Sequence, residues 1–270
     1  QRIVDSGRDL PIIPIMGSLK KLPVTGRLPS VVISNLSPLV EGGRYPTKRV
    51  EDEPIVIEAD VFKDGHDVVV ANVEWRKTGE SEWTVFPMTS LENDRWSATL
   101  AFAELGNYEI AVTAWADDFL TWLHDFERRH TGDQVEFSTE IEEGRVILNN
   151  AAIRAAGGKA HEDAEAIETL TTKLMSSDAK AVPALMNEEN VLKMLSRWPD
   201  RTLASRSGDM IPLLVETKQS AYSAWYEFFP RSAEGIAGRH STFRDCLPRI
   251  EDAKAMGFDV IYSPPIHPIG

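Results

Sequence analysis

Hydrophobic and polar residues alternate with a period of two through much of the first half of the chain. In residues 107–115 every second side chain is hydrophobic, and residues 96–102 repeat the pattern, as expected for strands with one buried face. Short turns containing glycine, asparagine or aspartate separate these runs. Strands at such spacing are typical of an antiparallel β-sandwich. We therefore predict an immunoglobulin-like β-sandwich over residues 31–137.

Trp75, Trp83, Trp96 and Trp115 are concentrated on the strand-like runs of this predicted sandwich. Exposed aromatic rings on strands can form a platform on which sugars stack, whereas buried rings belong to the core. Trp115 is out of phase with the hydrophobic face of its strand and is the candidate for an exposed ring. The sequence is compatible both with an exposed sugar-binding platform and with rings buried in the core.

The period changes to that of a helix over residues 138–200. Ser138 or Thr139 is a suitable N-cap for a first helix, which Gly157 would end. A second helix is predicted to begin at His161, where acidic residues follow in the first turn. We predict a small helical bundle whose role is packing or dimerisation. His161 has no neighbours at metal-ligand spacing, so we expect no metal site.

Strand character returns at residues 210–216, within a return strand and connector that we place at residues 201–224. The helices would therefore be an insertion between strands of one sheet. Residues 1–30 contain four prolines and no hydrophobic period, which predicts an extended leader, or alternatively a tail that docks on an anionic surface.

The segment 225–270 has a different organisation. An aromatic run at 225–229 ends at a proline, and a helix is predicted to begin near Leu247 or Pro248 and to end at Gly257. A nearly all-apolar strand, 259–263, follows. This order predicts a βαβ unit with parallel strands covered on both faces.

Two titratable residues follow the carboxyl ends of these two strands, where ligands bind in barrels and open α/β folds. Arg231 could hold a phosphate or carboxylate, or could instead pair with an acidic neighbour. His267 could donate a hydrogen bond to a substrate, or could be a packed loop residue. These two side chains are the predicted substrate-binding residues.

Composition excludes some partners. The formal net charge of −13 argues against nucleic acid and against an anionic membrane surface. No apolar run approaches the roughly 18–20 residues of a membrane span, and residues 1–30 contain no signal peptide. The single cysteine, Cys246, cannot form an internal disulfide. Together these features indicate a cytoplasmic protein.

Several stretches resemble a known family. The segment beginning "WYEFFPRS" and ending "GFDVIYSPPIHPIG" is similar to the opening strand–helix–strand of the catalytic (β/α)8 barrel in the α-amylase superfamily. Within it, residues 42–67, 93–122 and 223–232 resemble the α-1,4-glucan:maltose-1-phosphate maltosyltransferases. The resemblance covers roughly residues 31–270.

This resemblance implies a retaining transfer of maltosyl from maltose 1-phosphate to the non-reducing end of an α-1,4-glucan, by a homodimer without a cofactor. Retention needs two carboxyl groups about 5 Å apart. In the superfamily these lie on later barrel strands, so we expect no catalytic residue in this chain. Glu227 and Asp259 lie within the first two strands, and neither is read as the nucleophile.

A barrel takes about 250 residues, so residues 225–270 can supply only its start. Two alternatives remain. The chain could be a non-catalytic module that binds glucan or dimerises, or it could be part of another α-amylase-superfamily hydrolase or branching enzyme.

Overall fold

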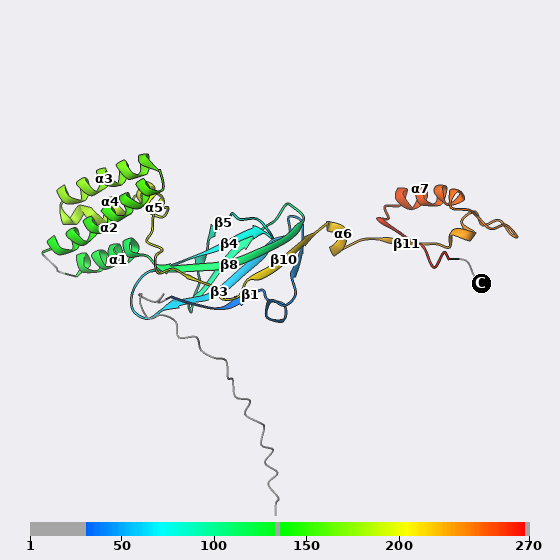
Figure 1. Cartoon of the computed structure of the whole chain (residues 1–270), viewed down its shortest axis with the longest axis horizontal. Coiled ribbons are helices and arrows are strands. Elements are labelled where there is room, and N and C mark those ends of the chain that lie inside the picture. Colours follow the sequence, from blue (N-terminus) through cyan, green and yellow to red (C-terminus); the bar gives the residue numbers. More distant parts are fainter. Residues whose placement is uncertain (1–30, 133–135, 268–270) are drawn as a thin grey trace, which may run out of the picture.

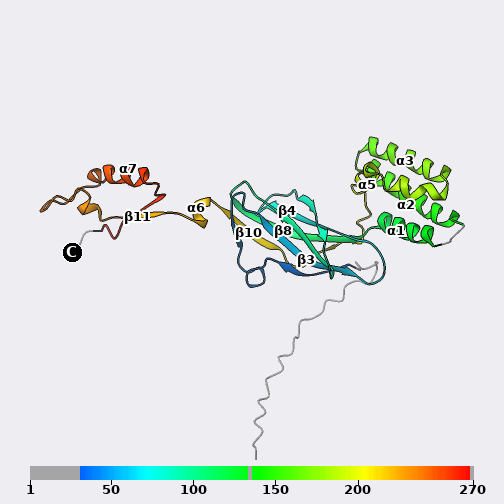
Figure 2. The same ribbon diagram turned by 180° about the vertical axis from the view of Figure 1, so that it is seen from behind.

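The computed structural model describes residues 31–132 and 136–267. The leader predicted at residues 1–30 lies outside the described residues. Three units follow one another along the longest axis of the molecule (Figure 1). The two-sheet unit (residues 31–116 and 205–216) is in the middle, the helical unit (residues 118–198) lies at one end, and the C-terminal unit (residues 218–267) lies at the other (Figure 2).

The two-sheet unit contains a smaller and a larger sheet. The smaller has the order β1-β3-β7-β6, with bounds Val31–Ser37, Ile55–Lys63, Arg95–Leu100 and Thr89–Ser90. The larger has the order β2-β10-β8-β4-β5, with bounds Thr47–Val50, Ile211–Glu216, Gly106–Ala116, Val69–Lys77 and Thr84–Pro87. The short strand β9 (Ser205–Arg206) pairs with β8.

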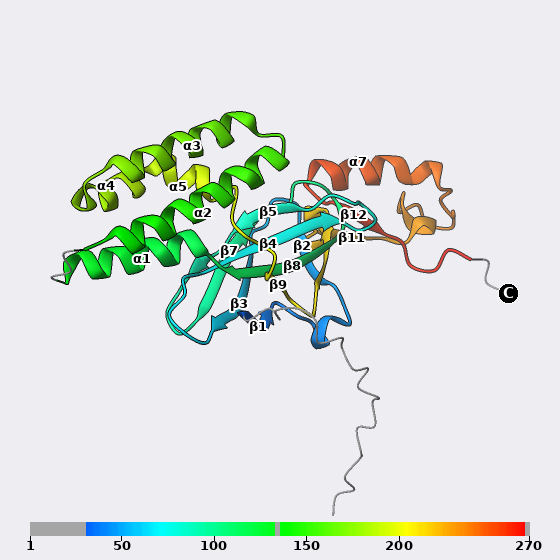
Figure 3. The same cartoon turned by 60° about the vertical axis from the view of Figure 1, so that its left-hand side comes forward.

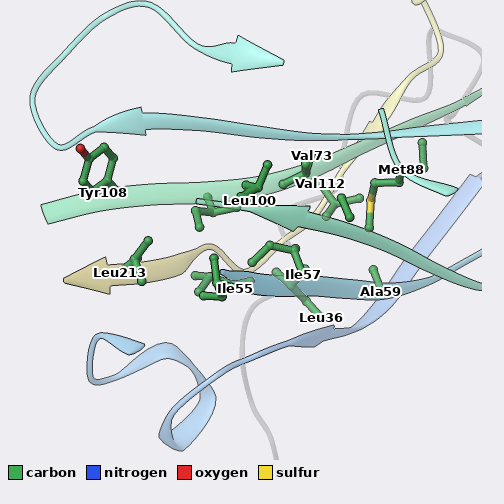
Figure 4. Packing of buried hydrophobic residues seen from close by; sticks show 14 of the residues in the cluster. Leu36, Ile55, Ile57, Ala59, Val73, Met88, Leu100, Tyr108, Val112 and Leu213 are labelled. Atoms are coloured by element: carbon green, nitrogen blue, oxygen red, sulfur yellow. The ribbon is translucent and has the colours of Figure 1, made fainter. Parts of the chain in front are cut away.

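One hydrophobic core lies between these sheets (Figure 4). Ile55 and Ile57 of β3 are fully buried, as are Ile110 and Val112 of β8. The alternation predicted for 107–115 is therefore confirmed. Each such side chain contributes about 1.5–3 kcal/mol through its removal from water.

The strands within residues 31–137 that pair with one another are antiparallel, as predicted, and the return strand β10 adds one parallel pair. β2 pairs in parallel with β10, and Thr47 lies opposite Leu213. The sequence of β2 has little hydrophobic alternation because the strand lies at the edge of its sheet and meets one neighbour only. Backbone hydrogen bonds to β10 position β2, and such bonds do not depend on a hydrophobic pattern in the sequence.

The helical unit has five α-helices among the described residues: α1 (Asp118–Thr131), α2 (Ser138–Gly157), α3 (His161–Ser176), α4 (Val182–Met186) and α5 (Glu189–Leu195). The predicted start and end of α2 and the start of α3 are confirmed. The predicted side-chain cap of α2 is wrong: Phe137 is the N-cap, and it makes no capping hydrogen bond through its side chain. The Ser138 amide instead donates to Glu136 over 2.9 Å.

Helix α1 was not predicted from the sequence. Asp117 caps this helix, since its carboxylate accepts a hydrogen bond of 2.9 Å from the Leu120 amide. Trp122 and Phe126 then bury their rings against the other helices, with 5.6 Å between ring centres. The local signals for a helix were present, since Asp117 is a favourable N-cap and Phe119, Trp122 and Phe126 recur at helical spacing.

The helical unit lies between β8 and β10 in the chain, yet these two strands are antiparallel neighbours in the larger sheet. The helices thus interrupt one sheet between paired strands, which supports the predicted insertion. Every helix in the described ranges 31–132 and 136–267 is too short or too polar to cross a bilayer.

The C-terminal unit contains α6 (Lys218–Ala221), β11 (Trp225–Glu227), α7 (Leu247–Ala255) and β12 (Val260–Tyr262). Four 3-10 turns complete the described elements of the chain: Glu41–Gly43, Ala179–Ala181, Pro230–Ser232 and Arg244–Cys246. β11 and β12 pair in parallel, and the predicted helix start and βαβ order are confirmed.

The predicted burial of the last strand on both faces is wrong. Val260 and Ile261 are only partly buried, and Tyr262 is 46% exposed. Within the described residues β11 and β12 form a sheet of two strands, and a sheet that small cannot bury its own apolar side chains.

Candidate functional site

A cavity of about 690 Å³ lies at the carboxyl ends of β11 and β12. Arg231 and His267, the two predicted substrate-binding residues, both line it. They are far apart in sequence, and the parallel pairing of the two strands brings them to the same edge. The structure therefore brings the predicted pair together.

Arg231 lies in the 3-10 turn directly after β11. Its guanidinium carbon is 5.5 Å from the centre of the Phe229 ring, and its backbone carbonyl accepts a 2.9 Å hydrogen bond from the Ser241 amide. Among the described residues no Asp or Glu lies within ion-pair distance of it. The alternative of a structural ion pair thus finds no partner there, and the charge faces the cavity.

His267 follows β12 and is exposed. The preceding Pro264 is buried and Pro265 also lines the cavity, so the two prolines hold the chain against its rim. His240 lines the cavity as well, from the loop between β11 and α7. The cavity thus combines one guanidinium with two imidazoles.

The contribution of this loop to the cavity was not predicted from the sequence. Gly235 and Gly238 adopt φ of 68° and 76°, which glycine tolerates without strain and which turn the chain back over the strand ends. The two glycines were the available signal, because such residues often mark a loop that approaches a ligand site.

Polar contacts fix the end of the loop. Asp245 accepts hydrogen bonds from the Thr242 amide at 2.7 Å and from the Thr242 hydroxyl at 2.9 Å. The backbone hydrogen bond, with help from the hydroxyl, lowers the pKa of Asp245 below its usual value. The Cys246 thiol lies 3.6 Å from the Pro230 carbonyl, so it joins the loop to the turn that carries Arg231.

The chemistry of this lining suits the binding of an anion. Guanidinium, imidazole and the hydroxyls of Ser241 and Thr242 are donors, and no described residue that lines the cavity is Asp or Glu. Retaining glycosyl transfer requires two carboxyl groups. The described lining therefore supplies binding groups rather than a nucleophile and an acid.

Of the two arrangements left open for Trp115, the structure shows the buried one. Its ring is 3% exposed, because the chain returning from the helical unit lies over it and places the Arg201 guanidinium 4.4 Å from the ring centre. Trp75 packs edge-on against Phe102 in the core, with 5.1 Å between ring centres. The Trp96 indole donates a 3.2 Å hydrogen bond to the Val61 carbonyl.

Two arginines contact the Trp83 ring. The guanidinium carbons of Arg76 and Arg206 lie 4.5 Å and 4.1 Å from its ring centre. The four tryptophans of the two-sheet unit are thus all engaged by other side chains or the backbone. Among the described residues no cluster of His, Cys, Asp and Glu has the geometry of a metal site.

Comparison with known proteins identifies the family. Residues 29–217 match the family described as "Alpha-1,4-glucan:maltose-1-phosphate maltosyltransferase, domain N/S". An α-1,4-glucan:maltose-1-phosphate maltosyltransferase of Chlorobaculum tepidum is 38% identical over 240 residues, which cover 89% of this chain and 35% of that protein. The proteins of the same name from Myxococcus xanthus and Streptomyces coelicolor are each 36% identical, over 92% and 94% of this chain.

The chain spans little more than a third of the length of these relatives: 35%, 38% and 37%. The match with domain N/S ends one residue before α6, so it contains the two-sheet and helical units and leaves out the C-terminal unit. On these grounds the chain belongs to the α-1,4-glucan:maltose-1-phosphate maltosyltransferase family.

Proposed function

We propose that this chain is part of a retaining glycosyltransferase that moves maltosyl from maltose 1-phosphate to the non-reducing end of an α-1,4-glucan. The family relationship supports this reaction. The observation that carries the proposal in the structure is the shared cavity of Arg231 and His267 at the ends of two parallel strands. The guanidinium would bind the donor phosphate, and the imidazole would donate a hydrogen bond to the sugar.

In this proposal the catalytic carboxylates lie outside the described chain. β11, α7 and β12 would be the first strand, helix and strand of a (β/α)8 barrel. The exposed apolar surface of this unit supports that reading, since neighbouring strands and helices of a barrel would cover it. The two packed sheets would form an immunoglobulin-like sandwich that carries the helical unit as an insertion.

A homodimer built through the helical unit belongs to the same proposal. Ile153 on the outer side of α2 is 69% exposed, and Val146, two turns earlier, is 45% exposed. Such a stripe on a helix is a suitable contact for a second copy. Within the proposal the enzyme works in the cytoplasm.

The test uses a protein of the length of the relatives and measures phosphate release from maltose 1-phosphate with a glucan acceptor. Arg231→Gln should raise the KM for maltose 1-phosphate by about tenfold or more, because a charge-assisted contact to phosphate is lost. Arg244→Gln is the control, since Arg244 does not line this cavity.

An unchanged KM in Arg231→Gln would remove Arg231 from the donor site. No phosphate release by the unmodified protein would reject the reaction itself. Equal activity on donors without phosphate would instead favour a hydrolase or branching enzyme of the α-amylase superfamily.

A further inference from the structure

A second cavity, of about 600 Å³, lies between the two-sheet unit and the helical unit. Its floor is the outer face of β4, β5 and β8, and α1, α2 and α5 contribute its walls. Residues 196–201, in the yellow segment that leads from α5 back to the strands, close one side (Figure 3). This cavity is separate from the one at Arg231, which belongs to the other end of the molecule (Figure 1).

Asn72 is a buried polar residue on the floor of this cavity. Its neighbours Ala71 and Val73 face the hydrophobic core, so the side chain of Asn72 points to the opposite face of β4. Asn72 is 7% exposed, and its amide makes no hydrogen bond to any described residue. Asn72 is not among the described residues with a buried, unpartnered side-chain atom, so its side-chain amide remains accessible from the cavity. It therefore offers hydrogen-bond donors and an acceptor to a ligand there.

Trp115 and Arg201 form a stacked pair beside Asn72. Asp117 lies behind the indole, 3.4 Å from its nitrogen, and uses its other carboxylate oxygen to cap α1. Asp117 is 8% exposed, and these two hydrogen bonds fix its carboxylate. Indole, guanidinium, carboxylate and amide thus meet within one enclosed space.

The charges around this cavity balance. Three carboxylates and three guanidiniums line it: Asp117, Asp118, Asp200, Arg154, Arg197 and Arg201. Burial, then the negative charges of Asp200 and Asp117, raise the pKa of Asp118. An anionic ligand would meet the carboxylates and a cationic ligand the guanidiniums, so the lining favours a ligand without charge.

Hydrophobic side chains fill the remaining surface, among them Val85, Ile147 and Leu192. A neutral carbohydrate offers what these groups need. Its hydroxyls can donate to carboxylates and accept from guanidinium and amide, and its C–H faces can lie against the apolar walls. The cavity volume is within the range of about 300–1,000 Å³ typical of sites for small molecules.

We propose that this cavity between the two units binds a segment of a neutral α-1,4-glucan, with Asn72 and Arg201 as ligand-binding residues. The choice of an α-1,4-linked chain rests on the proposed function, whereas the choice of a neutral saccharide rests on the cavity alone. Because the cavity lies away from the one at Arg231, it would hold the polymer rather than present its reacting end.

The experiment titrates the 270-residue chain with maltoheptaose and records calorimetric binding together with the indole N–H signals of its tryptophans in NMR. Maltoheptaose should bind and should shift the Trp115 signal. Asn72→Leu should raise Kd by about tenfold, because the ligand loses its hydrogen bonds to the amide. Arg201→Ala should weaken binding as well.

Asn107→Leu is the matched control, since Asn107 lies exposed on β8 outside the cavity. It should bind like the unmodified chain. Circular dichroism and thermal unfolding of each variant report whether it is folded. No binding of maltoheptaose, or equal Kd values for Asn72→Leu and Asn107→Leu in folded proteins, would overturn the proposal.

Equal binding of cellohexaose would overturn the choice of an α-1,4-glucan and with it the link to the proposed function. None of these measurements depends on phosphate release. Failure of the reaction and failure of this site therefore give different results.

Discussion

The two-sheet unit and the C-terminal unit both contain strands rich in aromatic and branched side chains, but they use them differently. In the two-sheet unit these side chains enter one shared core, where Ile57, Ile110 and Ile211 are fully buried. Beyond residue 217 of the described chain the buried apolar side chains are Ala233, Cys246, Ala253 and Pro264, all small.

Many large hydrophobic side chains of the C-terminal unit remain on its surface: Tyr222, Trp225, Phe229, Ile236, Phe243, Leu247, Ile250, Met256, Tyr262 and Ile266 are each at least 37% exposed. Strand pairing and helix caps are therefore sufficient to define local structure, whereas a core needs a second layer. Short-range patterns thus determine the secondary structure of both units, whereas packing against a second layer determines which side chains are buried.

The difference between the two units is tested most strongly by removing the same atoms from each of them. Ile57→Ala should lower the free energy of unfolding by about 3–4 kcal/mol, since it leaves a cavity in a closed core. Ile236→Ala removes the same atoms from a side chain that is 51% exposed and should change stability by about 0.5 kcal/mol or less. Urea unfolding measures both, and similar losses would contradict the difference between the two units.

A smaller effect is expected in the helical unit, where α1 and α2 approach closely at Gly144. A Cβ there would lie 2.4 Å from Cζ2 of Trp122, whose indole nitrogen is held by a 2.7 Å hydrogen bond to the Glu140 carbonyl. Gly144→Ala should therefore cost about 2 kcal/mol through overpacking.

Gly157→Ala is the control within the same helix, because a Cβ at Gly157 meets nothing within 4 Å. It should leave stability unchanged or raise it slightly, since alanine favours helix more than glycine. Thermal unfolding followed at the helical signal compares the two variants. A Gly144→Ala protein as stable as the unmodified chain would show that Trp122 moves freely.

The smallest effect concerns the outer face of the smaller sheet. The Asn35 amide, and then the Arg95 guanidinium at 2.8 Å, lower the pKa of Asp60. A carboxyl whose folded pKa is depressed stabilises the fold above its unfolded pKa, and this contribution is lost as pH falls through the folded value. Asp60→Asn should therefore lose a few tenths of a kcal/mol at pH 7, a size typical of exposed pairs.

The loss should fade as pH drops below 3.8, the value of an unperturbed aspartate. Chemical denaturation at pH 7 and at pH 3 measures it. Asp64→Asn, in the turn after β3, serves as the control because Asp64 forms no ion pair within the described chain. A loss of the same size at both pH values would show that the charge of Asp60 contributes nothing.

The sequence predicted those elements whose side-chain period reflects a buried face. β8 alternates because one face meets the core, and α2 has a glycine end that ordinary helix rules recognise. β2 was not predicted because it is a polar edge strand. α1 was not predicted because it begins directly after the long strand β8. The position of Trp115 stayed open because its cover comes from Arg201, far along the chain.

The candidate site shows the same division. Arg231 and His267 were predicted because the order of strand, helix and strand fixes which edge both residues reach. The contribution of His240 was missed, since a loop carries no periodic pattern and only the turns at Gly235 and Gly238 direct it to the cavity.

The position of β10 between β2 and β8 has a consequence for synthesis on the ribosome. β2 and β8 are made early, but the strand that joins them emerges only after the whole helical unit has been translated. The helices have mainly local contacts and can fold before β10 is available to complete the sheet. During that interval the open edge of β8 can pair with another nascent chain, so a slow passage through the helical codons would favour aggregation before the last strand arrives.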